Sequence, residues 1–139
     1  YKLNFPDRSF NVILAFELFQ YLDNPKKAIS EVLRVLKPKG TLVLSMPMVY
    51  RVHDDLVRYT KIYLEKLLTD FSEVKFIYTG NFYTIILDII RDKIVRFPNR
   101  LFRLVCYLIF IVLTLLIPLS QKFSKDRNFV SGYLIVAKK

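Results

Sequence analysis

The chain has 139 residues and a formal net charge of +10, with 53% hydrophobic and 24% charged residues. That length suffices for one domain with a packed core, and that apolar content excludes a disordered tail. A single cysteine, Cys106, excludes an internal disulfide. The positive charge favours an anionic partner, such as nucleic acid, anionic lipid or an anionic substrate.

The first half of the chain predicts a strand–helix–strand unit. Residues 10–16 form a near-continuous apolar run, which is typical of a strand buried on both faces. Asp23-Asn24-Pro25 starts a helical pattern that ends at Pro38 and Gly40. Residues 41–46 form a second apolar run. Such a unit predicts parallel strands, with functional loops at their carboxyl ends.

The second half predicts further elements of the same sheet and a long insert. Thr60 is placed to cap a second helix. Residues 74–78 and 129–137 predict a third and a last strand. About fifty residues separate these two strands, too many for a plain loop in a compact domain, so we expect the insert to carry its own structure.

The insert itself is strongly apolar. Residues 82–97 show an amphipathic helical pattern, Pro98 interrupts it, and residues 104–119 contain no charge. Sixteen residues reach about 24 Å as a helix, short of a bilayer core of about 30 Å. A single span would also separate the last strand from its sheet. Eight Lys/Arg against three Asp/Glu in residues 81–128 favour an anionic lipid surface. The alternative is a helical cap packed on the sheet or in a dimer.

Three motifs carry a resemblance to a known family. They are LNFPDRSFNVI at residues 3–13, ELFQYLDNP at residues 17–25 and EVLRVLKPKGTL at residues 31–42. In this order and spacing they resemble class I S-adenosylmethionine-dependent methyltransferases of the type 11 kind. A fourth segment, His53-Asp54 to Arg58-Tyr59-Thr60, resembles one branch of that family.

The resemblance implies an α/β, Rossmann-like fold, of which the chain holds the C-terminal half of the sheet. Residues 1–80 would form the core, residues 81–128 the helical apolar insert, and residues 129–139 the last strand of the sheet. The family's Gly-rich cofactor loop is missing, because the chain has only three glycines. Its acidic ribose-binding residue is missing too, Tyr21 replaces a frequent His, and Lys39 replaces a frequent Gly. Together with the non-Met start at Tyr1, these departures predict a fragment that is inactive alone.

The site residues follow from the resemblance and from the strand ends. We expect S-adenosylmethionine as cofactor, with its methionine and methyl end lined by Phe16, Glu17, Leu18 and Phe19. In the alternative interpretation the two phenylalanines belong to the core and Glu17 is a helix-terminus charge. We predict no metal site, because one histidine and one cysteine do not make a common zinc site.

The segment after the second strand predicts the acceptor side. His53 or Asp54 would act as base or substrate contact, and Arg58 would hold an anionic acceptor. The alternative is an Asp54–Arg58 ion pair that fixes the loop.

The expected function is methyl transfer to a small-molecule or lipid-linked acceptor, at the cytoplasmic face of a membrane. A rival is a non-catalytic membrane or interaction module that keeps a degenerate methyltransferase half. An RNA-binding methyltransferase is disfavoured, because half of the charge surrounds the apolar insert and no RNA-binding motif is present.

Overall fold

The computed structural model describes residues 2–48, 56–123 and 130–139. The chain forms two compact units. The first unit combines Tyr1–Tyr78 with Gly132–Lys139, and the second is Thr79–Ser131. The two ends of the chain therefore build one unit, and the residues between them build the other.

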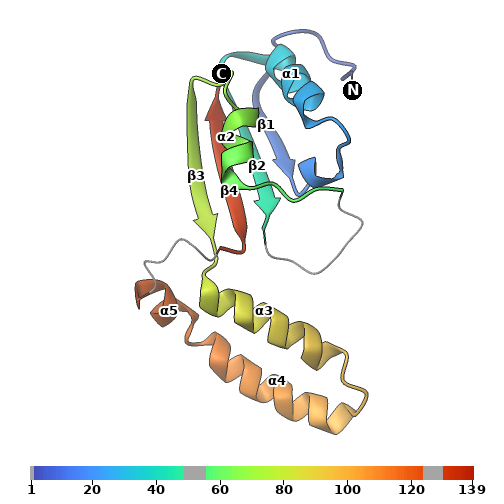
Figure 1. The fold of residues 1–139 in the computed structure, drawn as a ribbon, viewed down its shortest axis with the longest axis vertical. Coiled ribbons are helices and arrows are strands. Elements are labelled where there is room, and N and C mark those ends of the chain that lie inside the picture. Colours follow the sequence, from blue (N-terminus) through green and yellow to red (C-terminus); the bar gives the residue numbers. More distant parts are fainter. Residues whose placement is uncertain (1, 49–55, 124–129) are drawn as a thin grey trace. The chain divides into compact units, whose positions relative to one another are not determined.

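The first unit contains a four-stranded sheet in the order β1-β2-β4-β3 (Figure 1). Its strands are β1 (Phe10–Phe16), β2 (Leu36–Pro47), β3 (Glu73–Thr79) and β4 (Gly132–Lys138). β1 and β2 are parallel and are joined through α1 (Pro25–Val35), so the predicted strand–helix–strand unit is confirmed. β4, predicted to begin at residue 129, starts at Gly132 and runs antiparallel to β2.

The boundary between α1 and β2 differs from the prediction. The helix ends at Val35, and the strand begins at Leu36 rather than at Thr41. Pro38 lacks an amide proton and disfavours helical geometry at the residue before it. β2 bulges between Leu36 and Thr41. Leu36 pairs with Phe10 and Thr41 with Val12, so the β2 segment is longer than the β1 segment that it pairs with.

Gly40 lies in this bulge, close to the backbone of β1. A Cβ at position 40 would lie 3.2 Å from the carbonyl oxygen of Asn11 and 2.8 Å from that of Lys37. A side chain there would force the bulge to move at Lys37 and would crowd the backbone of β1, so the close approach favours glycine.

Lys39, on the outside of the bulge, has a φ of 64° in the left-handed region. L-residues with a Cβ are disfavoured there, whereas glycine is not. We expect Lys39→Gly to raise the free energy of unfolding by about 0.5–1 kcal/mol, as less backbone strain outweighs the greater freedom of the unfolded chain. Urea unfolding measures this change. Lys37→Gly, on the same bulge but without a positive φ, should destabilise instead.

One face of the sheet is covered and the other is open. α1 and α2 (Lys61–Leu67) pack on the covered face (Figure 1). The buried side chains there are Ile29, Val32 and Val35 of α1, Leu64 and Leu67 of α2, Leu42, Leu44 and Met46 of β2, and Tyr133, Ile135 and Ala137 of β4. On the open face of β1, Val12, Leu14 and Phe16 are 54–61% exposed. Within the first unit, the prediction that β1 is buried on both faces is wrong, because no described element of that unit covers this side.

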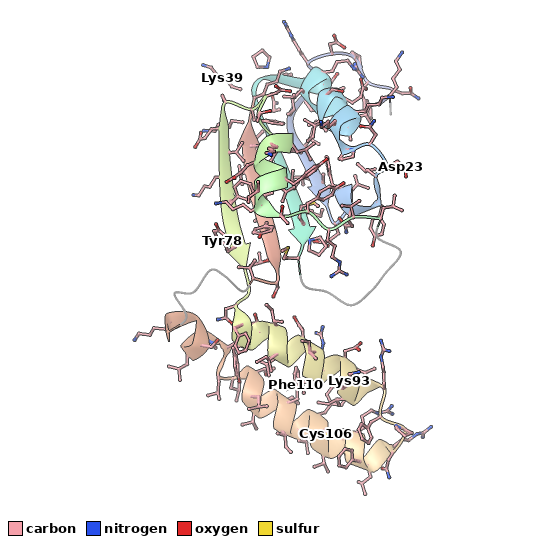
Figure 2. All side chains as sticks on the ribbon, viewed as in Figure 1. Asp23, Lys39, Tyr78, Lys93, Cys106 and Phe110 are labelled. Carbon is pink, nitrogen blue, oxygen red and sulfur yellow. The ribbon has the colours of Figure 1, made fainter. Side chains whose placement is uncertain are left out.

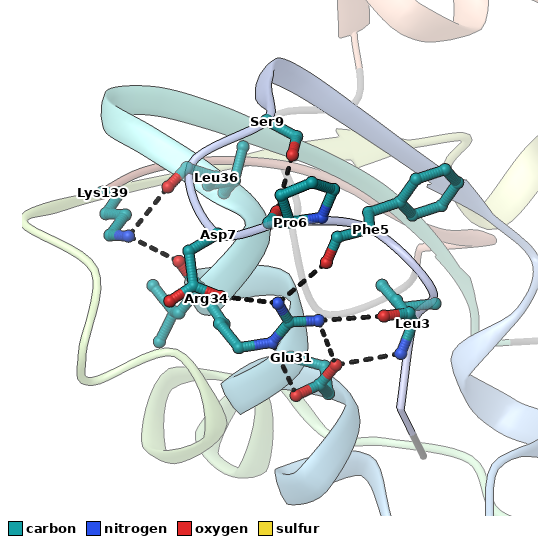
Figure 3. Close-up of polar contacts among 10 residues, drawn as sticks. Leu3, Phe5, Pro6, Asp7, Ser9, Glu31, Arg34, Leu36 and Lys139 are labelled. Carbon is teal, nitrogen blue, oxygen red and sulfur yellow. Dashed lines mark hydrogen bonds and ion pairs between the residues drawn. The ribbon is translucent and has the colours of Figure 1, made fainter.

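Arg34 of α1 anchors the segment that leads into β1 (Figure 3). It pairs in bidentate fashion with Glu31, through Nε–Oε1 at 3.0 Å and Nη2–Oε2 at 2.8 Å. It also donates to the Asp7 carboxylate and to the carbonyl oxygens of Leu3 and Phe5. All five guanidinium protons thus have acceptors, a geometry that lysine cannot reproduce. Two of the resemblance motifs are joined by this contact.

The same contact makes stability depend on pH. The hydrogen bond from Arg34 lowers the pKa of Glu31 from its usual 4.5 to about 2. A lowered carboxyl pKa gives stability that is present above pH 4.5 and is lost as the pH falls towards 2. We expect Glu31→Gln to flatten the pH dependence of the unfolding free energy in that window, measured by urea unfolding at each pH. Glu65→Gln, the same chemical change on α2, should leave the dependence in place.

The second unit is built on a helical hairpin. α3 (Phe82–Val95) and α4 (Arg100–Thr114) lie antiparallel (Figure 1), and α5 (Ile117–Phe123) follows. The Tyr83 hydroxyl donates to the Leu113 carbonyl at 2.7 Å and holds the two long helices together. The uncharged run of residues 104–119 is split because Pro118 cannot donate the helical hydrogen bond to Thr114.

Among the described residues, no helix combines the length and the hydropathy that a membrane crossing requires.

Candidate functional site

The carboxyl ends of β1 and β2 are joined by Glu17 and Ser45. Phe16 pairs with Ser45 across the two strands, and the Glu17 amide donates to the Ser45 carbonyl at 3.3 Å. The Ser45 hydroxyl donates to the Glu17 carboxylate at 2.8 Å. Glu17 has a φ of 49°, a left-handed geometry that is uncommon outside glycine. Backbone strain of this kind clusters at functional sites. Here it places a carboxylate at the carboxyl ends of the strands, which is where α/β folds bind ligands.

The structure treats the four predicted cofactor residues unequally. Phe16 and Leu18 are 55% and 48% exposed at the end of β1, and Glu17 beside them is exposed too. Phe19, in the short 3₁₀ helix η1 (Phe19–Tyr21), is only 2% exposed and packs in the core. Phe19 thus has the core position of the alternative interpretation. Cofactor contact by any of the four stays a prediction.

Gln20 ties the loop before α2 to these strand ends. Its backbone carbonyl accepts from the amides of Leu56 at 2.9 Å and Val57 at 3.3 Å. Its side chain is buried, with Nε2 donating to Glu17 at 3.5 Å. The Oε1 atom of Gln20 has no hydrogen-bond partner within the described part of the chain. A buried amide oxygen without a donor is rare, and it marks a place where a donor group belongs.

A pocket of about 360 Å³ lies between the end of η1 and the start of α2. Its lining comes from two segments, Leu22, Asp23 and Pro25 on one side and Val57, Arg58, Tyr59, Thr60 and Tyr63 on the other. The volume is at the lower end of small-molecule sites. Asp23 stands on the loop that leads into α1 (Figure 2). The pocket therefore combines both signs of charge with aromatic walls.

Arg58, the predicted acceptor residue, lies in this pocket and is half-buried. Its Nη1 donates to the Met48 carbonyl at 3.4 Å, which links it to the end of β2. Tyr59 stacks on Tyr63 with ring centroids 5.1 Å apart, and the Tyr59 hydroxyl donates to the Phe19 carbonyl at 3.4 Å. The Arg58 segment is thus linked to β2 through the side chain of Arg58 and to η1 through its neighbour Tyr59.

His53 and Asp54 lie outside the described residues, so their roles as base or ion-pair partner stay predictions. Among the residues that the structure describes, no three His, Cys, Asp or Glu side chains gather as metal ligands would.

Sequence reasoning missed Ser45 and Gln20. Ser45 could have been found as the one polar residue at the carboxyl end of an apolar strand. Nothing in the sequence indicated that Gln20 is buried, because its burial depends on the turn of η1.

Comparisons with known proteins show similarity in the first third of the sequence and in the fold. A sequence model described as a methyltransferase domain matches residues 1–44. A structure of a possible histamine N-methyltransferase from Thermotoga maritima aligns with a TM-score of 0.60 and 15% identity, covering 99% of this chain and 60% of that one. No curated protein matches the chain.

Two further structures show the breadth of the fold. Phosphoethanolamine N-methyltransferase 2 from Haemonchus contortus, in complex with S-adenosyl-L-methionine, aligns with a TM-score of 0.51 and 16% identity, covering 98% of this chain and 34% of that one. The cyclase SpnF aligns with a TM-score of 0.52 and 18% identity, covering 99% of this chain and 52% of that one. At these identities the alignments establish the fold alone.

The chain thus has the fold of the S-adenosylmethionine-dependent methyltransferase structures with which it aligns, and its residues 1–44 match the methyltransferase-domain model. It spans about 60% of the length of the Thermotoga protein. The sheet order and the antiparallel β4 confirm the predicted Rossmann-like half, with its helical insert before the last strand.

Proposed function

We propose that the chain forms the acceptor side of an enzyme that transfers a methyl group from S-adenosylmethionine. The observation that carries this proposal is that two features lie together at the carboxyl ends of the strands. The strained Glu17 stands at the end of β1, and the Arg58 pocket is tethered to the same strand ends through Gln20. Ligands of open α/β sheets bind at these ends.

The residues present fit one end of the cofactor. Phe16 and Leu18 offer exposed apolar surface, and Glu17 offers a carboxylate between them. A methionine chain with a cationic sulfonium and ammonium suits such a surface. The Gly-rich loop and the ribose-binding acid are not in this sequence, so we propose that residues outside it hold the adenosine end.

The chemistry is a displacement, for which the bound cofactor supplies an electrophilic methyl group. The residues of this chain would hold the acceptor in line with that methyl group, and such positioning can remove several kcal/mol of barrier. A base is needed only where the acceptor must lose a proton, a role for which His53 or Asp54 is the candidate. Arg58 suits an acceptor that carries a carboxylate or a phosphate.

We further propose that the acceptor is lipid-linked or amphiphilic and is met at the cytoplasmic membrane face. The apolar helices of the second unit support this proposal, because an enzyme held at a membrane meets its acceptor there.

The test follows labelled methyl groups. The native protein, with whatever residues precede Tyr1, is incubated with methyl-labelled S-adenosylmethionine and an extract of its source cells. Label in the organic phase supports a lipid-linked acceptor, and label in the aqueous small-molecule fraction supports methyl transfer to a soluble one. No label above a heat-treated control, together with no binding of S-adenosylhomocysteine by calorimetry, contradicts the enzyme and favours the non-catalytic module.

A further inference from the structure

From Leu101 to Val112, every exposed residue of α4 is apolar. We call the side that they form the outer face of α4. The exposed fractions of its residues range from 48% to 72%. These residues are Leu101, Phe102, Leu104, Val105, Leu108, Ile109, Ile111 and Val112. A contiguous exposed patch of this kind on a helix marks an interaction site, because water-facing helices carry charged and polar residues instead.

Apart from Arg100, the exposed first residue of the helix, the polar residues of α4 are turned the other way. Arg103, Tyr107 and Thr114 are half-buried on the side that packs against α3, together with Cys106 and Phe110. Figure 2 shows Phe110 between the two helices. A helix that faced water on its outer side would have the reverse arrangement. The environment that suits the outer face is therefore apolar.

The charges near the outer face of α4 indicate an anionic partner. Five cations lie around the turn between α3 and α4, namely Arg91, Lys93, Arg96, Arg100 and Arg103, against two carboxylates. Those carboxylates are held by ion pairs within α3, Asp88 with Arg91 at 3.2 Å and Asp92 with Arg96 at 3.3 Å. An apolar strip bordered by cations and free of anions fits the interface of an anionic bilayer.

The apolar strip continues past the end of α4. Leu115, Leu116 and Leu119 are 73%, 45% and 51% exposed, and Lys122 beyond them is exposed as well. α4 has 15 residues and is about 22 Å long, whereas a bilayer core is about 30 Å thick. A helix of this length with one apolar side is suited to lie in the membrane plane.

We propose that the α3–α4 hairpin docks onto an anionic lipid bilayer, with the outer face of α4 inserted in the plane of the interface. This inference does not depend on methyl transfer, because it needs neither cofactor nor acceptor. It names the surface through which an enzyme with a lipid-linked acceptor would reach that acceptor.

Vesicle binding tests the surface. The chain is mixed with vesicles of phosphatidylcholine containing about one third phosphatidylglycerol, at low salt, and the bound fraction is measured by flotation. We expect binding that Leu108→Asp weakens by about ten-fold or more. Ile62→Asp, at a 67% exposed position of α2, is the matched control and should bind as the unmodified chain does. Circular dichroism verifies that each variant is folded.

A second pair of variants tests the charge. Lys93→Gln combined with Arg100→Gln should weaken binding by about ten-fold or more, since each cation near the surface is worth about five-fold. Lys26→Gln combined with Lys27→Gln makes the same charge change on exposed positions of α1 and should have little effect. Equal losses in both pairs would mean that net charge alone drives binding and would overturn the proposed surface.

Orientation can be read from single tryptophans, because the chain has none of its own. We expect Leu101→Trp, Leu108→Trp and Leu115→Trp to shift their emission to the blue on vesicles, with similar depths from quenching by brominated lipids. Leu14→Trp on the open sheet face should not shift. A steady change of depth along α4 would overturn the in-plane arrangement.

Two other results would overturn the docking proposal itself. One is an unmodified chain that stays unbound. The other is a Leu108→Asp variant that changes only the mass of an oligomer in ultracentrifugation, which would assign the outer face to a second copy of the chain.

Discussion

Replacing Leu44 with alanine should lower the free energy of unfolding by about 2–5 kcal/mol, the range for a large side chain removed from a packed core. Leu44 is 1% exposed in the central strand β2, and it pairs with Ala15 of β1 and Ile135 of β4. All three side chains lie on the covered face of the sheet, so the cavity left by the substitution cannot fill with water at low cost. Urea unfolding of the 139-residue chain, monitored by circular dichroism, measures the loss.

Val43→Ala is the matched control, because residue 43 follows the same strand but points to the open face. Val43 is half-buried, and removing its two methyl groups should cost about 1 kcal/mol or less. Equal losses at the two positions would contradict the one-sided core and would mean that a further layer covers the open face in solution.

That one-sided core could not be read from the sequence. The apolar run of residues 10–16 predicts a strand buried on both faces, and the strand forms where predicted. Its second face is exposed in the first unit because burial depends on elements outside the strand, and no described element of that unit lies over Val12, Leu14 and Phe16. β1 also ends the sheet order. An open face and a free edge at one strand agree with a chain that spans about 60% of the aligned Thermotoga protein.

Local chemistry made other elements predictable. Asn24 and Thr60 cap their helices through side-chain oxygens, as predicted from their positions directly before a helical pattern. Pro38 was predicted to end the first helix, and that helix ends slightly earlier, at Val35. The motifs indicated the family resemblance, but they did not predict which contacts their residues make. Arg34 and Glu31, both in the third motif, hold the segment that leads into β1.

The site was predictable only in part, since long-range contacts define it. Arg58 was found from its motif, and the structure places it in a pocket with Asp23, which lies thirty-five positions earlier in the chain. The meeting of these segments depends on two hydrogen bonds to the Gln20 carbonyl, and a backbone contact of that kind leaves no trace in side-chain identity.

Arg58→Ala should reduce the kcat/KM of methyl transfer by about 10- to 150-fold in the native protein. A hydrogen bond to a charged group is worth about 1.5–3 kcal/mol, which corresponds to that range. If Arg58 holds an anionic group of the acceptor in ground and transition states alike, the loss appears in the KM of the acceptor and leaves kcat nearly unchanged. The KM of S-adenosylmethionine should not move. Initial rates with labelled S-adenosylmethionine and the fraction that accepts the label provide these values.

A purely structural role for Arg58 predicts a different pattern. Its bond to the Met48 carbonyl would then be the important one, so the alanine variant would lower the melting temperature and kcat together. Arg58→Lys separates the two roles further, because lysine keeps the charge but loses the planar fork that grips a carboxylate or phosphate, so acceptor KM should recover only in part. Lys66→Ala removes the same charge from an exposed position of α2 outside the pocket and should leave both constants unchanged. An unchanged acceptor KM in Arg58→Ala would remove this residue from the binding site and leave the pocket to a neutral acceptor.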